Sequence, residues 1–422
     1  MSERRVQFHF PKKFMWGASI STHQVEGGNY NQWSVWELET AKRRALDAED
    51  QYGHLSIWPN VKSDASMPHN YVSGDACDHF NLYEQDFKLA QQIGLDVVRC
   101  GVEWSRIEPE EGEFNEEATT HYIKYFNSLK AKGIKPVITL WHWSVPVWFA
   151  QKGGFLKHRN IKYFTRYVKH ISEKLGTYFT YVITLNEPTV YAVMSYHERR
   201  WPPEGDSKMQ TLRVMLNLAK AHNKSYKIIK KSRPSTKIGL AHNCAYFYTG
   251  DDSIISKAVV WICHRFSNEF FVNRVKRRQD FFGLNYYFAN KICGTRVHND
   301  NKANNDLGWD MQPDKVGPLA GQLYKKYRLP ILITESGVAD MKDQYRKWWI
   351  TESVKALNLA LKNNTSIIGY IHWSLLDNFE WAEGFWPRFG LIEVDYKTKK
   401  RKVRESAKFY ARLIKAVHDH NG

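Results

Sequence analysis

No run of eighteen or more apolar residues occurs in the sequence, so no segment is predicted to span a membrane. The 5 cysteines are widely spread and never form a CxxC pair, which argues against a zinc ribbon or a redox pair. None of the 17 histidines stands in an HExxH or comparable spacing, so neither a metal site nor a cofactor is expected. The first stretch, MSERRVQFHFPKKF, lacks the apolar core of a secretory signal. These absences favour a cytoplasmic protein with reduced thiols.

Positive charge is in excess, since 61 Lys and Arg against 44 Asp and Glu give a formal net charge of +17. Such a balance can indicate a nucleic-acid or membrane-surface partner. The densest basic runs are KTKKRKVR, residues 397–404, and VKRR, residues 275–278. Neither has the aromatic and glycine pattern of an RNA-binding segment or the spacing of a zinc finger or basic zipper. We interpret both runs as solvated helix starts and loops and expect no nucleic-acid and no membrane partner, with an electrostatic docking surface as the alternative.

Short apolar runs alternate with amphipathic helical stretches along the chain, and no flexible linker interrupts them. Helices are expected over residues 161–176, 211–226 and 342–361. Eight such apolar runs begin at Phe14, Val97, Lys135, Tyr181, Lys237, Phe281, Pro330 and Ile367. Continuous apolar strands that alternate with helices predict an α/β fold with a covered parallel sheet. Eight units predict a single (β/α)8 TIM barrel over residues 1–422, with a long rim insertion around residues 27–83.

Polar and aromatic side chains stand where the predicted strands end, at the barrel mouth where such folds place their chemistry. They are Arg99, His142, Trp143, Asn186, Glu187, Asn243, Asn285, Tyr287, Glu335 and Trp373. Only Glu187 and Glu335 are carboxylates, and their strands face each other across the barrel. Two opposed carboxylates are what glycoside hydrolysis needs, because one protonates the leaving oxygen while the other attacks or stabilises the oxocarbenium-like carbon. Each glutamate taken alone also fits an ion pair with a barrel lysine or arginine.

Nearly the whole chain resembles glycoside hydrolase family 1, the β-glucosidase and β-galactosidase family. FMWGASISTHQVEGG resembles the family's N-terminal signature, TLNEP its acid/base motif and ITESG its nucleophile motif. The closing segment WSLLDNFEWAEGFWPRFGLIEVDY resembles the family's last strand and sugar-binding loop. The resemblance implies a retaining glycosidase that acts on a small β-glycoside or oligosaccharide.

The resemblance also assigns roles to single residues. It makes Glu187 the general acid/base and Glu335 the nucleophile, with Arg99 and Tyr287 holding Glu335. Asn186 would bind the sugar 2-hydroxyl, a contact that strengthens in the transition state. The remaining substrate-binding set comprises Gln24, His142, Trp143, Asn285, Trp373, Glu380, Trp381 and Phe389. For Trp143 and Phe389, simple core packing stays an alternative.

Physical reasoning predicts different protonation states for the two carboxyls. Arg99 beside Glu335 should favour the ionised nucleophile. Glu187, next to that anion and to apolar walls, should have a raised pKa and act as an acid. Once Glu335 is glycosylated its charge is lost, so the pKa of Glu187 should fall and it can act as a base towards water.

Several positions depart from the family pattern. Ser336 follows the nucleophile where Asn is usual, and Ser144 stands where Asp is usual. The loop around ERRWPPEG, residues 198–205, is atypical, and the segment 270–281 is shorter than in relatives. Residues 256–271 can still supply one apolar helix over the neighbouring strand. We expect weak order in the rim around the fifth and sixth strands and a more open aglycone side.

Three other functions are alternatives for this sequence. A catalytically dead relative would lack one of the two glutamates. A 6-phospho-β-glycosidase would carry a smaller residue at Glu380, followed by a lysine and a tyrosine. A basic, non-enzymatic binding protein is the third. The sequence separates neither gluco from galacto preference nor hydrolysis from transglycosylation, and it predicts no oligomeric state.

Overall fold

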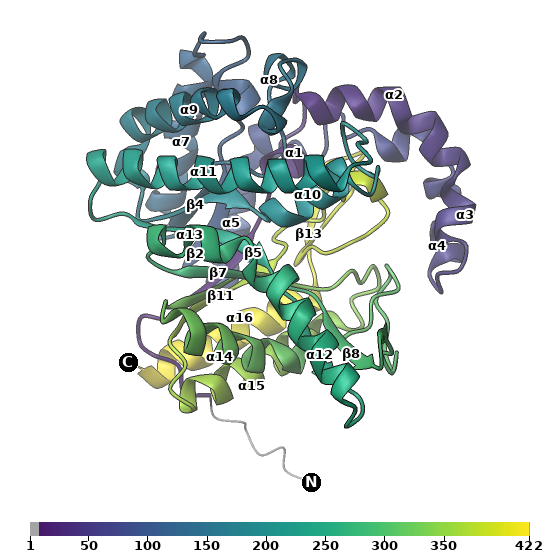
Figure 1. Ribbon diagram of the computed structural model, residues 1–422. Helices are drawn as coiled ribbons and strands as arrows, with labels where there is room; N and C mark the ends of the chain where they lie inside the picture. The colour runs from purple at the N-terminus through teal and green to yellow at the C-terminus, as the bar shows by residue number, and fades with distance from the viewer. Residues whose placement is uncertain (1–7, 422) are drawn as a thin grey trace.

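The computed structural model describes residues 8–421 (Figure 1). Its eight parallel strands close into a barrel in the order β1-β11-β10-β7-β5-β4-β3-β2. They are β1 (Met15–Ser19), β2 (Val97–Gly101), β3 (Lys135–Thr139), β4 (Tyr181–Asn186), β5 (Lys237–Asn243), β7 (Phe282–Tyr286), β10 (Ile331–Ser336) and β11 (Ile367–Trp373). All eight coincide with the predicted apolar runs, so the (β/α)8 barrel is confirmed. Residues 1–7, the first half of the segment MSERRVQFHFPKKF that lacks the apolar core of a secretory signal, lie outside the described range.

Helices surround the barrel (Figure 1). The main covering helices are α5 (His79–Ile93), α7 (Glu116–Ala131), α9 (Ile161–Lys174), α11 (Lys208–Ser232), α14 (Val316–Tyr327), α15 (Arg346–Lys362) and α16 (Glu405–Asn421). α9 lies where its apolar spacing places it, whereas α11 is longer at both ends than predicted. α15 starts four residues later than predicted, because the Asp340 carboxylate accepts the backbone N–H groups of Gln344, Tyr345 and Arg346 in a turn before the helix. No helix within residues 8–421 is long and apolar enough to cross a bilayer.

The barrel interior is packed with side chains and is not a pore. One cluster fills its lower part with residues from all eight strands or their first flanking position: Met15, Val97, Val137, Ile183, Ala241, Phe281, Leu332 and Ile371. A larger core lies between the strands and the outer helices. Two buried layers explain why the strands read as continuous apolar runs rather than alternating ones. Polar side chains are therefore concentrated at the strand ends.

The segment 27–83 forms part of the rim. It carries α2 (Gln32–Leu46), α3 (Ala48–Tyr52), α4 (Trp58–Ala65) and a short turn (Pro68–Tyr71) before α5. α2 begins with a capping box, in which Asn31 accepts from the Ser34 backbone while Ser34 Oγ accepts from the Asn31 backbone. From α2, Trp33 packs against Trp381 with ring centroids 4.6 Å apart. The insertion thus supports the loop that carries Trp381.

The basic run 397–404 is only partly solvated, whereas Lys276 and Arg277 of the run 275–278 are exposed. Arg401, in β13 (Arg401–Val403), is fully buried and pairs with Asp86 at 2.8 Å. Arg404 is also buried and pairs with Asp377. The interpretation as solvated helix starts and loops is therefore wrong for these two residues, because each buried charge needs an opposite charge beside it.

The rim around β5 and β7 departs from expectation in one respect. Residues 256–271 form α12 (Ile254–Cys263) and a π-helical turn (His264–Glu269), but this helix turns its apolar side to solvent. Cover for the strands comes instead from Phe271, Val272 and Val275, which are buried, at α13 (Val272–Val275). The expectation that the residues 256–271 cover a strand is therefore wrong for α12. A small sheet of β6 (Tyr246–Thr249), β8 (Ala289–Cys293) and β9 (Arg296–Val297) completes this rim.

Weak order of this rim stays a prediction. Since α12 contributes little buried apolar surface, it should open locally at low free-energy cost. Amide hydrogen exchange across residues 254–288 should be faster than in α9 or α11. Uniformly slow exchange there would contradict the prediction.

Candidate active site

A hollow of about 610 Å³ opens at the carboxyl ends of the barrel strands. The thirteen predicted site residues all meet there. Nine line the hollow, namely His142, Trp143, Glu187, Tyr287, Glu335, Trp373, Glu380, Trp381 and Phe389. The other four are fully buried and bonded to one or more of these residues or their neighbours: Gln24, Arg99, Asn186 and Asn285. The strand ends thus bring together residues that are up to 365 positions apart in sequence.

Glu335, in β10, is held by two donors. Arg99 from β2 donates from Nη1 to Glu335 Oε1 and from Nη2 to Asn186 Oδ1 at 2.7 Å. The Tyr287 hydroxyl donates to Glu335 Oε2 at 2.7 Å. Both oxygens are therefore oriented, and a permanent positive charge faces the carboxylate. This arrangement suits a group that must be ionised and correctly aimed.

Glu187 has a different environment. It stands between β4 and α10 (Pro188–Tyr196) with φ +41°, a left-handed conformation that side-chain-bearing residues rarely adopt. Its Oε1 accepts from Asn285 Nδ2 at 2.7 Å and from Asn243 Nδ2 at 3.1 Å. None of the ion pairs within residues 8–421 involves Glu187. Neutral amides leave this carboxyl free to be protonated.

The pKa values of the two carboxyls separate for physical reasons. Burial raises the pKa of both above the ordinary glutamate value. For Glu335, Arg99 and Tyr287 oppose that effect. For Glu187 the negative charge of Glu335 adds to burial, and the pKa rises to about 8. Glu187 is therefore protonated at neutral pH, as a general acid must be.

The raised pKa of Glu187 predicts a pH-dependent stability. Its pKa is about 8 in the folded protein against 4.5 as the ordinary value, so this group costs stability progressively as pH rises between those values. Glu187→Gln has no proton to lose. We expect the variant to be more stable than the parent by about 3 kcal/mol at pH 7 and equally stable near pH 4. Thermal unfolding against pH measures this, with exposed Glu173→Gln as the control; an equal difference at both pH values would contradict it.

Hydrogen bonding fixes the tautomer of His142. Arg99 can only donate, so Asn186 must present Oδ1 to it and turn Nδ2 towards His142 Nε2, 2.8 Å away. Burial holds the pKa of His142 well below its ordinary value, so the ring is neutral. Its proton must then sit on Nδ1, which has no protein partner and is buried at the hollow. His142 is thereby prepared to donate to a ligand hydroxyl.

Gln24 and Glu380 form a second polar pair at the floor of the hollow. Gln24 Nε2 donates to Asn378 Oδ1 at 2.9 Å and to the Phe379 carbonyl at 2.8 Å. Gln24 Oε1 is buried without a protein partner. Burial, together with Glu383, Glu335 and Glu187, raises the pKa of Glu380 well above its ordinary value. Both residues offer oxygens to ligand hydroxyls.

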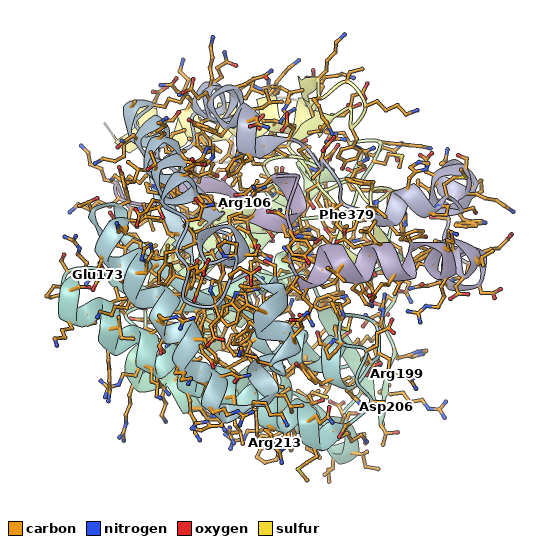
Figure 2. All side chains as sticks on the ribbon, turned by 90° about the horizontal axis from the view of Figure 1, so that it is seen from above. Arg106, Glu173, Arg199, Asp206, Arg213 and Phe379 are labelled. Carbon is orange, nitrogen blue, oxygen red and sulfur yellow. The ribbon has the colours of Figure 1, made fainter. Side chains whose placement is uncertain are left out.

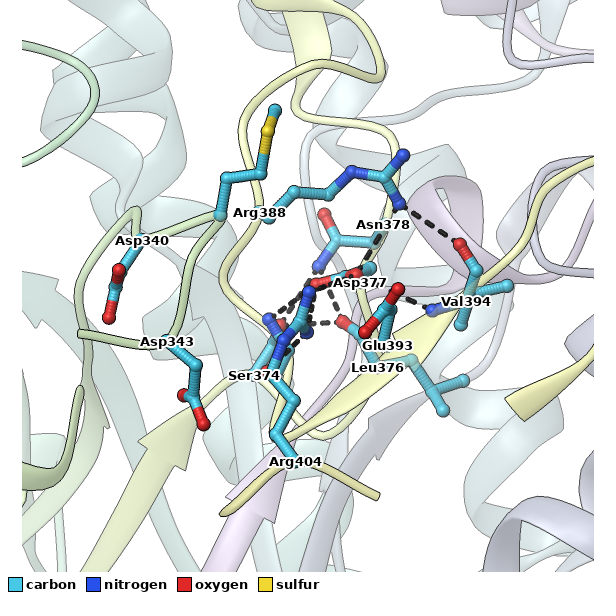
Figure 3. A network of polar contacts seen from close by, with 12 residues as sticks. Asp340, Asp343, Ser374, Leu376, Asp377, Asn378, Arg388, Glu393, Val394 and Arg404 are labelled. Carbon is cyan, nitrogen blue, oxygen red and sulfur yellow. Dashed lines mark hydrogen bonds and ion pairs between the residues drawn. The ribbon is translucent and has the colours of Figure 1, made fainter. Parts of the chain in front are cut away.

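A buried ion-pair network anchors the loop that carries Glu380 and Trp381 (Figure 3). Arg404 donates from both Nη atoms to the Asp377 carboxylate, at 2.8 and 2.9 Å. Burial alone would raise the pKa of Asp377, but Arg404 and Arg388 hold it below the ordinary value. Asn378 Nδ2 donates to Ser374 Oγ at 3.1 Å. Asp377 and Asn378, which precede Glu380 in the chain, are thus held in place.

Aromatic rings enclose the hollow. The Trp381 ring stacks on the His142 ring, and its centroid lies 4.8 Å from that of Trp143. Phe389 and Trp373 belong to one buried cluster. The atypical 198–205 loop adds Trp201, whose ring lies 4.4 Å from that of Trp143. Seen from above, the same loop brings Arg199 near Asp206 at the edge of the molecule (Figure 2), with Nη1 and Oδ2 3.7 Å apart. The apolar wall suits the flat faces of sugar rings.

The side chains of Ser336 and Ser144, which depart from the family pattern, bond to residues other than the two carboxyls. Ser336 Oγ accepts from Trp349 Nε1 at 3.1 Å, and Ser144 Oγ donates to Glu103 at 2.8 Å. The glycine of ITESG has a steric reason, since a Cβ on Gly337 would lie 1.8 Å from the carbonyl oxygen of Trp373. Neither serine contacts Glu187 or Glu335 through a side-chain hydrogen bond.

Several residues of the site, among them Asn243, Trp201 and Trp309, have no role predicted from the sequence. Asn243 was noted at its strand end but given no role, and it bonds Glu187. Trp201 was missed, because a tryptophan in an atypical loop gives no periodic signal. Asn285, predicted to bind substrate, is bonded to Glu187, Asn186 and Thr334, and its substrate-binding role stays a prediction.

An eight-stranded barrel with paired carboxylates and aromatic walls at its mouth defines a glycosidase-type site. The sequence model of glycosyl hydrolase family 1 matches residues 6–277 and 266–419, and its two parts meet in the shortened segment. The chain belongs to this family, and it is a glycoside hydrolase.

Three known glycosidases are similar over nearly their full length. A β-glycosidase from Pyrococcus horikoshii has a TM-score of 0.84 and 30% identity, covering 97% of this chain and 95% of that one. A β-glucosidase from Thermotoga maritima in complex with glucoimidazole has a TM-score of 0.85 and 25% identity, covering 97% and 99%. A β-galactosidase from Pyrococcus woesei is 27% identical over 94% of this chain and 95% of its own.

Proposed function

We propose that the enzyme is a retaining β-glycosidase that hydrolyses O-glycosidic bonds by double displacement. The observation that carries the proposal is the asymmetry of the carboxyl pair. Glu335 faces Arg99 and Tyr287, whereas Glu187 has only amide partners and a pKa of about 8. A retaining mechanism needs one ionised nucleophile and one protonated acid in the same pocket.

In the first step, a Glu335 oxygen attacks the anomeric carbon as the bond to the leaving oxygen breaks, and Glu187 gives its proton to that oxygen. The product is a glycosyl ester on Glu335. Its formation removes the negative charge beside Glu187, so the acidity of Glu187 increases and the carboxylate can accept a proton. In the second step, water loses a proton to Glu187 while its oxygen attacks the anomeric carbon, and the ester bond to Glu335 breaks.

The first sugar subsite fits a neutral hexose. Asn186 would hold the 2-hydroxyl, while His142, Gln24, Glu380 and Trp381 would bind the other hydroxyls, with Trp373 as the ring platform. We propose β-glucosides as the main substrates and β-galactosides or β-fucosides as side substrates. The names of the Thermotoga β-glucosidase and the Pyrococcus β-galactosidase support this range.

The alternatives are less well supported. A 6-phosphate would meet two acidic side chains, since Glu380 is kept and Glu383 stands close enough to raise its pKa further. A basic, non-enzymatic binding protein would have no use for two carboxyls with divergent environments. The cytoplasmic location expected from the sequence belongs to the same proposal, and cell fractionation tests it.

Product stereochemistry tests the mechanism. A panel of nitrophenyl glycosides identifies the preferred sugar, and NMR during early turnover reads the first anomer released. We expect the β-anomer first and carboxyl groups roughly 5–5.5 Å apart. Initial release of the α-anomer, or a separation of about 8 Å or more, would overturn double displacement.

A further inference from the structure

α12 presents its apolar face to solvent. Residues at positions i, i+1, i+4, i+7 and i+8 from the first turn lie on one face of a helix. In α12 these positions are Ile254, Ile255, Ala258, Trp261 and Ile262, and all five are exposed. Ile254 is 84% exposed, Trp261 64%, and Phe266 in the following turn 67%. Surface helices of soluble proteins normally show the opposite arrangement.

Polar contacts hold the inner side of this helix. Ser256 is fully buried and its Oγ accepts from the Gly294 backbone at 2.7 Å. Asn268 is buried and exchanges two hydrogen bonds with the Ala245 backbone, at 2.8 and 3.1 Å. Because Ser and Asn face inward and bond specific backbone groups, the outward direction of the apolar face is fixed. Rotation of the helix about its axis would break these hydrogen bonds.

Two exposed cationic residues stand on the apolar face or beside it. Arg265 falls within it, 5.8 Å from the Trp261 ring, and pairs with Glu269 at 2.8 Å. Glu269 is the sole carboxylate between Ile254 and Arg278. Lys257, which is also exposed, is the second cationic residue of residues 254–266, whereas Arg274, Lys276, Arg277 and Arg278 lie against α11. The whole chain, these residues included, has a formal net charge of +17.

The apolar face adjoins the active-site mouth. Ser267, in the turn that follows α12, lines the same hollow as Glu187 and Glu335. The lining of that hollow includes the apolar residues Val190, Val193, Met194, Phe288 and Leu307. Figure 1 shows α12 as a projecting rim helix rather than a part of the barrel wall. A surface bound to α12 would therefore lie beside the entrance.

We propose that the α12 face, residues 254–266, docks on an anionic lipid surface. Apolar side chains that include Trp and Phe, with Lys and Arg beside them, are the pattern of helices that lie in a bilayer interface. α12 has 10 residues, so it lies on the membrane and does not span it. A second copy of this chain is the less favoured occupant, since it brings another +17 to the contact, whereas an anionic surface brings opposite charge. This revises the expectation of no membrane partner and takes up the electrostatic docking surface.

Vesicle cosedimentation of the full chain tests the proposal. The protein should pellet with phosphatidylcholine vesicles that contain phosphatidylglycerol, bind pure phosphatidylcholine much less, and be released by salt. Trp261→Glu and Phe266→Glu should each weaken binding to the mixed vesicles about tenfold or more, because a charge replaces an inserted ring. Leu359→Glu, an equally exposed apolar position on α15 (61%), is the matched control and should bind as the parent does.

Three results would overturn the proposal. These are equal binding of the parent and Trp261→Glu, no preference for anionic vesicles, and a parent dimer that Trp261→Glu converts to monomer in light scattering. The last would assign the face to a second copy. Hydrolysis of a soluble nitrophenyl glycoside should be unchanged in both α12 variants, which shows that they fold. Because cosedimentation requires no turnover, its outcome is separate from that of the proposed catalytic mechanism.

Discussion

Glu335→Gln is expected to lower kcat by at least about 10⁴-fold on every β-glycoside. The amide oxygen is a poor nucleophile and cannot leave as a carboxylate, so neither formation nor cleavage of the ester can proceed. Tyr287 and Arg99 would still bond the side chain in part, so the fold and the hollow should be kept. Steady-state rates and a thermal unfolding scan measure the two effects separately.

A smaller side chain makes the assignment specific. In Glu335→Ala, azide can enter the vacated space and attack the anomeric carbon of a dinitrophenyl β-glycoside, which should give the α-glycosyl azide. Glu173→Gln, an exposed glutamate on α9, is the control and should retain full activity. Near-normal turnover by Glu335→Gln would remove Glu335 from the role of nucleophile.

Glu187→Gln is expected to separate substrates by the basicity of their leaving groups. Dinitrophenyl glycosides need little protonation, so their first step should continue near the parent rate. Alkyl and glycosyl leaving groups need the proton, and their kcat/KM should fall by roughly 10²–10⁴-fold. Deglycosylation also loses its base, so an early burst of dinitrophenol should precede a slow steady state. A uniform loss across leaving groups would contradict the acid role.

The pH profile provides an independent reading of Glu187. Because its pKa is about 8, the alkaline limb of kcat/KM should fall through about pH 8 as the acid loses its proton. The acidic limb should follow protonation of Glu335. In Glu187→Gln the alkaline limb should disappear for dinitrophenyl substrates. An alkaline limb that persists in the variant would assign that ionisation to another group.

The sequence was sufficient for the barrel and for the chemistry of its mouth. Buried parallel strands must be apolar on both faces, so runs such as VVRCG, residues 97–101, and ILITES, residues 331–336, could be read directly. Strand ends of a (β/α)8 barrel share one mouth. Glu187 and Glu335 therefore could be placed together without a structure.

The directions in which individual side chains and α12 face could not be predicted from the sequence. The direction in which Asn186 turns its amide, and hence the proton position on His142, follows from Arg99 standing beside it. The burial of Arg401 depends on Asp86, a partner 315 residues away. α12 looks like a covering helix in sequence, yet its polar side is the one that bonds the barrel rim. In each case a distant partner decides which way a side chain or helix faces.

Trapping of the glycosyl-enzyme tests the central claim most directly. A dinitrophenyl 2-deoxy-2-fluoro-β-glucoside lacks the 2-hydroxyl that Asn186 would bind, and fluorine disfavours the oxocarbenium-like transition states, but the good leaving group lets the first step occur. The intact mass should then increase by one fluoroglucosyl group, and peptide sequencing should place it on Glu335. Absence of any adduct while the parent turns over ordinary substrates, or an adduct on Glu187, would contradict the mechanism.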